Sequence, residues 1–122
     1  MSFGDLLAVY ALRMSEVIRL LDEFLNCGRP LFLYNAAYLL TELGSEMQAP
    51  FALYGQAILA ALSIDAGMRL RERAIDIEKR GLRDADLEYV SEVRDLLKRM
   101  VLSIESGEYE RDYEEMVRRR TQ

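Results

Sequence analysis

The chain contains no histidine, and this absence excludes more chemistry than any other feature of its composition. Histidine is the commonest general base in enzymes and the commonest transition-metal ligand. A di-iron helical bundle, which needs Glu-x-x-His motifs, is therefore excluded, and a serine or cysteine nucleophile would have only Lys79 or Lys98 as its base. We therefore expect a protein that is not an enzyme and that carries no cofactor or metal.

Cysteine is also scarce: Cys27 is the only one, so no disulfide can form within the chain, which is typical of a reducing compartment. The longest apolar stretch, residues 51–64, is shorter than the roughly 20 residues that a membrane-spanning helix needs. The N-terminus has no basic segment ahead of an apolar run, so it does not read as a signal peptide. These features predict a cytoplasmic protein with no membrane span.

Positive charge is in deficit, because the net charge is −5 and the sequence pI is about 4.8. An acidic surface repels phosphate backbones and argues against a nucleic-acid partner. The basic groups that might still bind an anionic partner are Arg69, Arg73 and Arg80 on one helical face and residues 118–120 near the end. Carboxylates next to both groups explain these arginines more simply, as intrachain ion pairs.

What the chain does contain is apolar residues at helical spacing. With 122 residues, of which 51% are hydrophobic, we expect one all-α domain over residues 1–122. The first helix is predicted over Phe3–Asn26, where apolar residues recur every three or four positions. Ser2 can cap its start, and Gly28 can end it.

The middle of the sequence predicts two helices that are apolar on nearly all sides. Pro30 suits the first position of a helix and Gly44 the position just past its end, which predicts a helix over Pro30–Leu43. A loop over residues 45–49 would follow. The next helix would begin at Pro50 and either continue to Arg80 or break near Gly67.

The last third of the sequence predicts a charged helical hairpin and a short final helix. Gly81 suits the end of the third helix, and Asp84 can cap a fourth that ends at Gly107. The short turn makes these two helices an antiparallel hairpin. A fifth helix is expected over Glu108–Arg120, which completes a compact bundle of about five helices with a nearly all-apolar central helix.

Four polar side chains stand in the apolar helices and are candidate ligand-binding residues. They are Tyr34, Tyr38, Tyr54 and Gln56. They could line an apolar pocket for a small amphipathic ligand, although buried tyrosines and amides also commonly hydrogen-bond within the protein.

Asp65 is the other candidate binding residue, because it falls on the apolar face of the third helix. A buried, unpaired carboxylate would have a raised pKa and would mark a site. Alternatively, Asp65 pairs with Arg69 one turn later or caps a new helix after a break. Glu92 and Asp95 leave a carboxylate-dependent metal phosphohydrolase as a further, weaker alternative.

The leading functional prediction is a helical interaction module that self-associates as a homodimer. Two adjacent helices without polar faces hold more apolar surface than one small bundle can bury, and symmetric dimers are the commonest way to cover the remainder. The interface is expected on the apolar surface of the second and third helices or on the charged hairpin. Another protein could cover the same surface. No motif in the sequence identifies a family, and the composition is that of many small helical proteins of prokaryotes.

Overall fold

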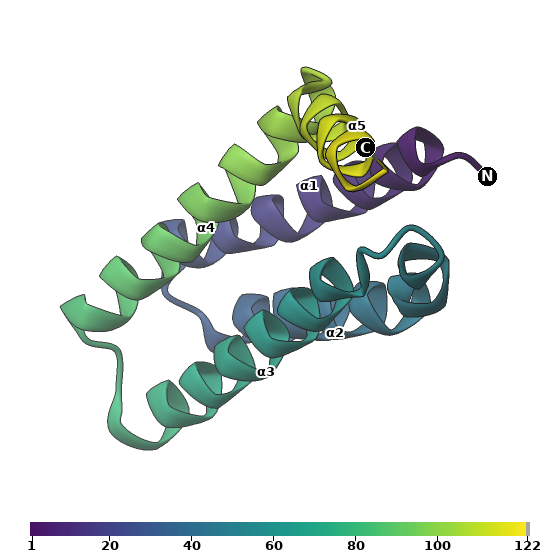
Figure 1. Cartoon of the computed structure of the whole chain (residues 1–122). Helices are drawn as coiled ribbons and strands as arrows, with labels where there is room; N and C mark the ends of the chain where they lie inside the picture. Colours follow the sequence, from purple (N-terminus) through teal and green to yellow (C-terminus); the bar gives the residue numbers. More distant parts are fainter. Residues whose placement is uncertain (122) are drawn as a thin grey trace.

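The computed structural model describes residues 1–121, which form five α-helices and no strand (Figure 1). The all-α bundle predicted from the sequence is confirmed. In chain order the helices are α1 (Phe3–Cys27), α2 (Pro30–Ala52), α3 (Ala57–Arg80), α4 (Asp84–Glu105) and α5 (Glu108–Arg120). None of these helices is both long and apolar enough to cross a membrane.

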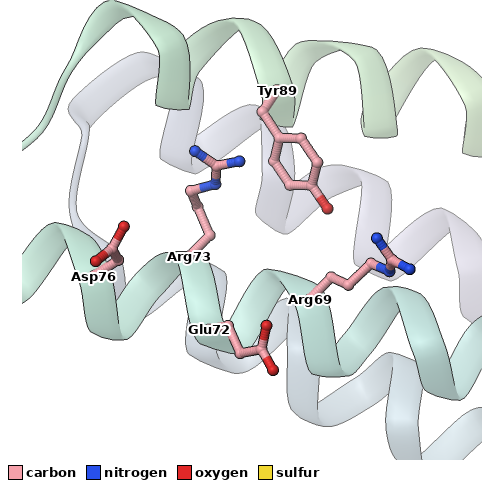
Figure 2. Close-up of a pocket in the computed structure, with 5 residues that line it drawn as sticks. All are labelled: Arg69, Glu72, Arg73, Asp76 and Tyr89. Atoms are coloured by element: carbon pink, nitrogen blue, oxygen red, sulfur yellow. The ribbon is translucent and has the colours of Figure 1, made fainter.

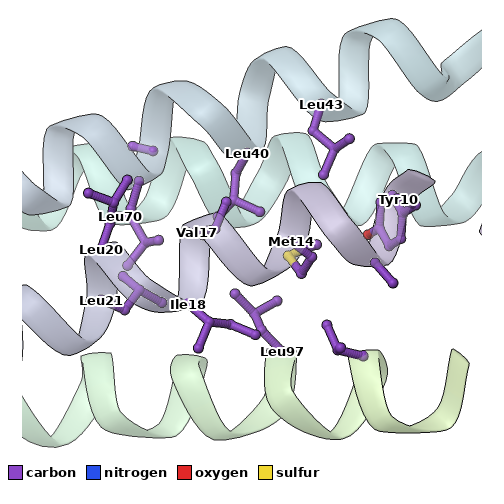
Figure 3. Packing of buried hydrophobic residues seen from close by; sticks show 14 of the residues in the cluster. Tyr10, Met14, Val17, Ile18, Leu20, Leu21, Leu40, Leu43, Leu70 and Leu97 are labelled. Carbon is purple, nitrogen blue, oxygen red and sulfur yellow. The ribbon is translucent and has the colours of Figure 1, made fainter. Parts of the chain in front are cut away.

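The long helix α1 forms the centre of the bundle, with α2 on one side and α4 on the other. Its buried side chains, among them Met14, Val17 and Leu21, lie between Leu40 of α2 and Leu97 of α4 (Figure 3). Apolar residues at three- and four-residue spacing put one continuous face of the helix into the core, and this burial is its main source of stability.

Both ends of α1 follow the sequence prediction. Ser2 Oγ accepts a hydrogen bond from the Asp5 N–H at 3.1 Å, and the Asp5 carboxylate accepts one from the Ser2 N–H at 3.2 Å. This reciprocal capping satisfies two donors that a helix start otherwise leaves free. Gly28, with φ of 71°, ends the helix by donating its N–H to the Phe24 carbonyl.

The predicted boundary between the second and third helices is wrong. Helix α2 does not end at Leu43 but continues to Ala52, so residues 45–49 are helical and not a loop. Gly44 does not end the helix; it lies where α2 meets α3. A Cβ atom on Gly44 would lie 2.6 Å from the Ala60 carbonyl oxygen, so only glycine fits this close approach.

The actual turn lies at residues 53–56, around Gly55, whose φ is 67°. Pro50 therefore sits in the last turn of α2 instead of beginning α3. Helix α3 is continuous and does not break at Gly67, which is a second contact glycine. A Cβ atom on Gly67 would lie 2.8 Å from the Ala37 carbonyl oxygen of α2. The two glycines hold α2 and α3 together as the most closely associated pair of helices.

The link between α3 and α4 is short, as predicted, and begins at Gly81, whose N–H donates to the Ile77 carbonyl at 2.8 Å. Asp84 is not the cap of α4; the Asp86 carboxylate instead accepts the Arg83 N–H at 2.9 Å. The two helices run in opposite directions, but α3 packs along α2 and α4 packs along α1. They therefore leave a groove between them instead of a closed hairpin.

Helix α5 spans the predicted range and lies across the N-terminal end of α1. The ring of Tyr113 lies 4.3 Å from that of Phe3, centroid to centroid. No residue of α5 is buried, so this helix contributes little to the core.

Candidate functional site

The most distinctive surface feature is an apolar hollow of about 340 Å³ between α3 and α4, which we call the α3–α4 groove. Its floor is Tyr10 of α1. Its walls are mainly apolar side chains from the two helices, namely Leu59, Leu62, Ala66, Val93, Leu96, Leu97 and Met100. The groove exists because α3 follows α2 while α4 follows α1, which leaves facing apolar residues without a partner.

Two polar groups in the floor of the groove are bonded to the protein itself. Ser63 Oγ donates a hydrogen bond to the Leu59 carbonyl at 3.0 Å, so the 2.6 Å contact between Tyr10 and Ser63 has the tyrosine hydroxyl as donor. Burial raises the pKa of Tyr10. With these groups satisfied, the floor offers an apolar surface more than a hydrogen-bonding one.

A charged hollow of about 470 Å³ adjoins one end of the groove. Figure 2 shows Arg73 of α3 extending toward Tyr89 of α4, with Arg69 one turn earlier on α3. The Arg73 guanidinium lies 4.3 Å from the centre of the Tyr89 ring, within the range of a cation–π contact. Glu72 and Asp76 complete the lining, so positive and negative side chains are equal in number and the hollow does not select an anion.

Behind this hollow lies a buried carboxylate that sequence reasoning missed. Asp86 is fully buried and accepts hydrogen bonds from Arg73 Nη1 at 3.0 Å and from both Arg80 terminal nitrogens at 3.0 and 2.8 Å. The Arg80 guanidinium is the main reason that the pKa of Asp86 is well below its usual range. Asp86 therefore fixes the start of α4 to the end of α3.

The sequence signal for this cluster was present but incomplete. Arg73 and Arg80 are seven residues apart, which places them on one face of α3, and Asp86 occupies the third position of the next helix. The spacing alone does not indicate that the Asp86 carboxylate points back toward α3 or that it is buried.

The predicted tyrosine pocket is not assembled in residues 1–121. Tyr38 is exposed on α2, and Tyr34 is half-buried one turn earlier, where the nearby Glu78 carboxylate raises the pKa of its hydroxyl. Tyr54 lies just past the far end of α2, 20 positions after Tyr34. A helix rises about 1.5 Å per residue, which separates Tyr34 and Tyr54 by roughly 30 Å.

Two of the candidate residues form internal hydrogen bonds instead. Tyr54 donates its hydroxyl proton to the Met1 carbonyl at 2.6 Å. Gln56 is buried, and its side-chain oxygen accepts a hydrogen bond from the Tyr109 hydroxyl at 2.9 Å. Their polar atoms thus serve to hold the N-terminus and α5 to the turn between α2 and α3.

Asp65 is exposed on the rim of the α3–α4 groove and is not a buried carboxylate. Its Oδ2 atom accepts a hydrogen bond from Arg69 Nε at 2.8 Å, which is the ion pair considered from the sequence. Because α3 is continuous, Asp65 caps no helix. Within residues 1–121, no three carboxylate or thiol side chains come close enough together to hold a metal ion.

Comparisons of the chain with protein-family models, with curated proteins and with solved structures found no match. The function is therefore inferred from the geometry of the molecule. Of the five candidate residues, only Asp65 contributes to the α3–α4 groove.

Proposed function

We propose that this chain is a helical interaction module that self-associates as a dimer, with a second copy covering the α3–α4 groove. The observation that carries this proposal is the pair of leucines on its two walls. Leu62 of α3 is 55% exposed and Leu96 of α4 is 58% exposed, beside a hollow that is itself apolar. Apolar surface of this kind gains free energy when it is removed from water.

Other exposed apolar side chains are more scattered. Leu12 and Leu31 are single exposed leucines on α1 and α2, which are normal on soluble proteins. Leu53 and Met1 line a second hollow of about 430 Å³, but it lies between the N-terminus and the turn after α2, not along two facing helices. The groove differs because facing residues from two helices line one hollow. A small amphipathic ligand has weaker support, since Tyr34, Tyr38 and Tyr54 do not line it.

The test is the oligomeric state of the purified protein and of two matched variants. Sedimentation velocity across the micromolar range should show a dimer for the wild type and a monomer for Leu96→Glu, which places a charge in the covered surface. Leu12→Glu, at a position 74% exposed on α1, should remain a dimer. A monomeric wild type throughout this range, or equal sensitivity of the two variants, would contradict the proposal.

A further inference from the structure

We infer how the two copies meet: helix α4 of one packs antiparallel on α4 of the other, about a two-fold axis that passes next to Leu96. This inference rests on the self-association proposed above and adds the arrangement and the residues that determine it. The observation behind it is a stripe on the outer edge of α4, formed by Glu92, Leu96 and Arg99, which we call the α4 stripe.

The three residues of the α4 stripe share one side of the helix. Their spacing of four and then three residues is the spacing of neighbours on a helical face. All three are exposed, and Leu96 also lines the α3–α4 groove, so the stripe continues the apolar wall outward. Glu92 and Arg99 do not line the groove themselves, so the stripe is the outer edge of its α4 wall.

The two charges of the stripe have no ion-pair partner among residues 1–121. Glu92 and Arg99 are seven residues apart, or about 10 Å along the helix axis, too far to pair with each other. Arg94, on another side of the same helix, does have a partner: its Nη1 atom lies 3.0 Å from Asp22 Oδ1 of α1. Arg94 is therefore paired within the chain, whereas the two charges of the α4 stripe are not.

A two-fold axis at Leu96 pairs both charges at once. Rotation reverses the direction of α4, so Glu92 of each copy lies opposite Arg99 of the other, with the two Leu96 side chains between the two ion pairs. A symmetric interface requires this kind of self-complementary surface, in which residue i contacts residue j and residue j contacts residue i. In the stripe, the opposite charges lie four and three residues from the central leucine, so an axis just before Leu96 brings Glu92 of each copy level with Arg99 of the other.

An axis running along the groove would fit less well. It would place α4 of one copy on α3 of the other. Rotation about such an axis does not reverse the direction of α4, so Glu92 of one copy could not lie opposite Arg99 of the other. Charge complementarity therefore favours α4 on α4.

Reversal of the two charges tests this arrangement. Glu92→Arg or Arg99→Glu alone puts like charges together twice in each dimer and should raise the dimer Kd by roughly tenfold or more. The double variant restores both pairs with the signs exchanged and should return Kd to near the wild-type value. Lys98→Glu makes the same change of charge on a different side of α4 and should leave Kd unchanged.

Disulfide trapping gives a second, independent readout. Leu96→Cys in a Cys27→Ser background places the two thiols across the axis, where oxidation should give a covalent dimer, whereas Lys98→Cys in the same background should not. Suppose that Leu96→Glu abolishes the dimer, but neither charge reversal changes its Kd and Leu96→Cys forms no disulfide. That result would overturn the α4 arrangement alone. A monomeric wild type would overturn this inference together with the proposed function.

Discussion

Replacing Asp86 with asparagine would remove the charge that binds two arginines of α3 to the start of α4. The carboxylate is fully buried and accepts three hydrogen bonds from Arg73 and Arg80 and one from the Arg83 N–H. Asparagine has nearly the same shape, but only one of its two terminal atoms accepts a hydrogen bond. Its amide group would point two donors toward guanidinium groups that are also donors.

The size of the effect follows from what the arginines can do once the carboxylate is gone. Removing one partner of a buried ion pair costs about 3–5 kcal/mol, mainly because the other charge stays buried. The Arg73 and Arg80 side chains are 29% and 21% exposed, so both can turn partly toward water. We therefore expect a smaller loss than for a fully buried pair: Asp86→Asn should lower the free energy of unfolding by about 2–3 kcal/mol.

Urea denaturation followed by far-UV circular dichroism measures this difference. The matched control is Asp84→Asn, which changes an exposed carboxylate in the same helical turn and should cost less than about 0.5 kcal/mol. Equal stabilities of Asp86→Asn and Asp84→Asn would refute the assignment of Asp86 as the group that fixes α4 to α3.

Two further predictions concern stability. Folding lowers the pKa of Asp86, so its ionised carboxylate contributes fully to the free energy of unfolding above about pH 5. That contribution is lost as the pH falls below about 4, near which an unfolded aspartate titrates. The urea midpoints of the wild type and of Asp86→Asn should therefore converge in acid. Gly67→Ala should destabilise by about 1–3 kcal/mol, because its methyl group would meet the Ala37 carbonyl of α2. Gly4→Ala, which meets only the movable end of Glu110, is the control, and equal thermal midpoints for the two alanine variants would contradict the packing role of Gly67.

Helix α1 could be predicted almost to the residue because its signals are local and agree with one another. Apolar spacing, the Ser2 cap and the Gly28 stop all act within or next to the helix itself. The end of α2 could not be predicted, because Gly44 has the same sequence signature whether it ends a helix or admits another helix to close contact. Only the position of α3, where Ala60 approaches Gly44, distinguishes the two roles.

The groove was hidden from sequence reasoning for a similar reason. The apolar stripes of α3 and α4 can be recognised from spacing, and a short connection favours packing one against the other. Which neighbour each stripe prefers depends on tertiary contacts: Gly44 and Gly67 draw α3 onto α2, and Arg94 joins α4 to Asp22 of α1. The surroundings of the candidate tyrosines could not be predicted for the same reason, since a polar tip on an apolar helix does not reveal which side of the bundle it faces.

These contacts also explain why an open apolar groove persists in so small a bundle. Closing α3 on α4 would separate α3 from α2 where they meet at Gly44 and Gly67, or would separate α4 from α1 at Arg94. Either change would lose packing that the present arrangement has. Asp86 holds only the joined ends of α3 and α4 together, so the helices stay connected there while facing apolar residues stay open along the groove. The exposure of Leu62 and Leu96 is therefore a consequence of how the bundle is held together, and this is why we place the interaction surface there.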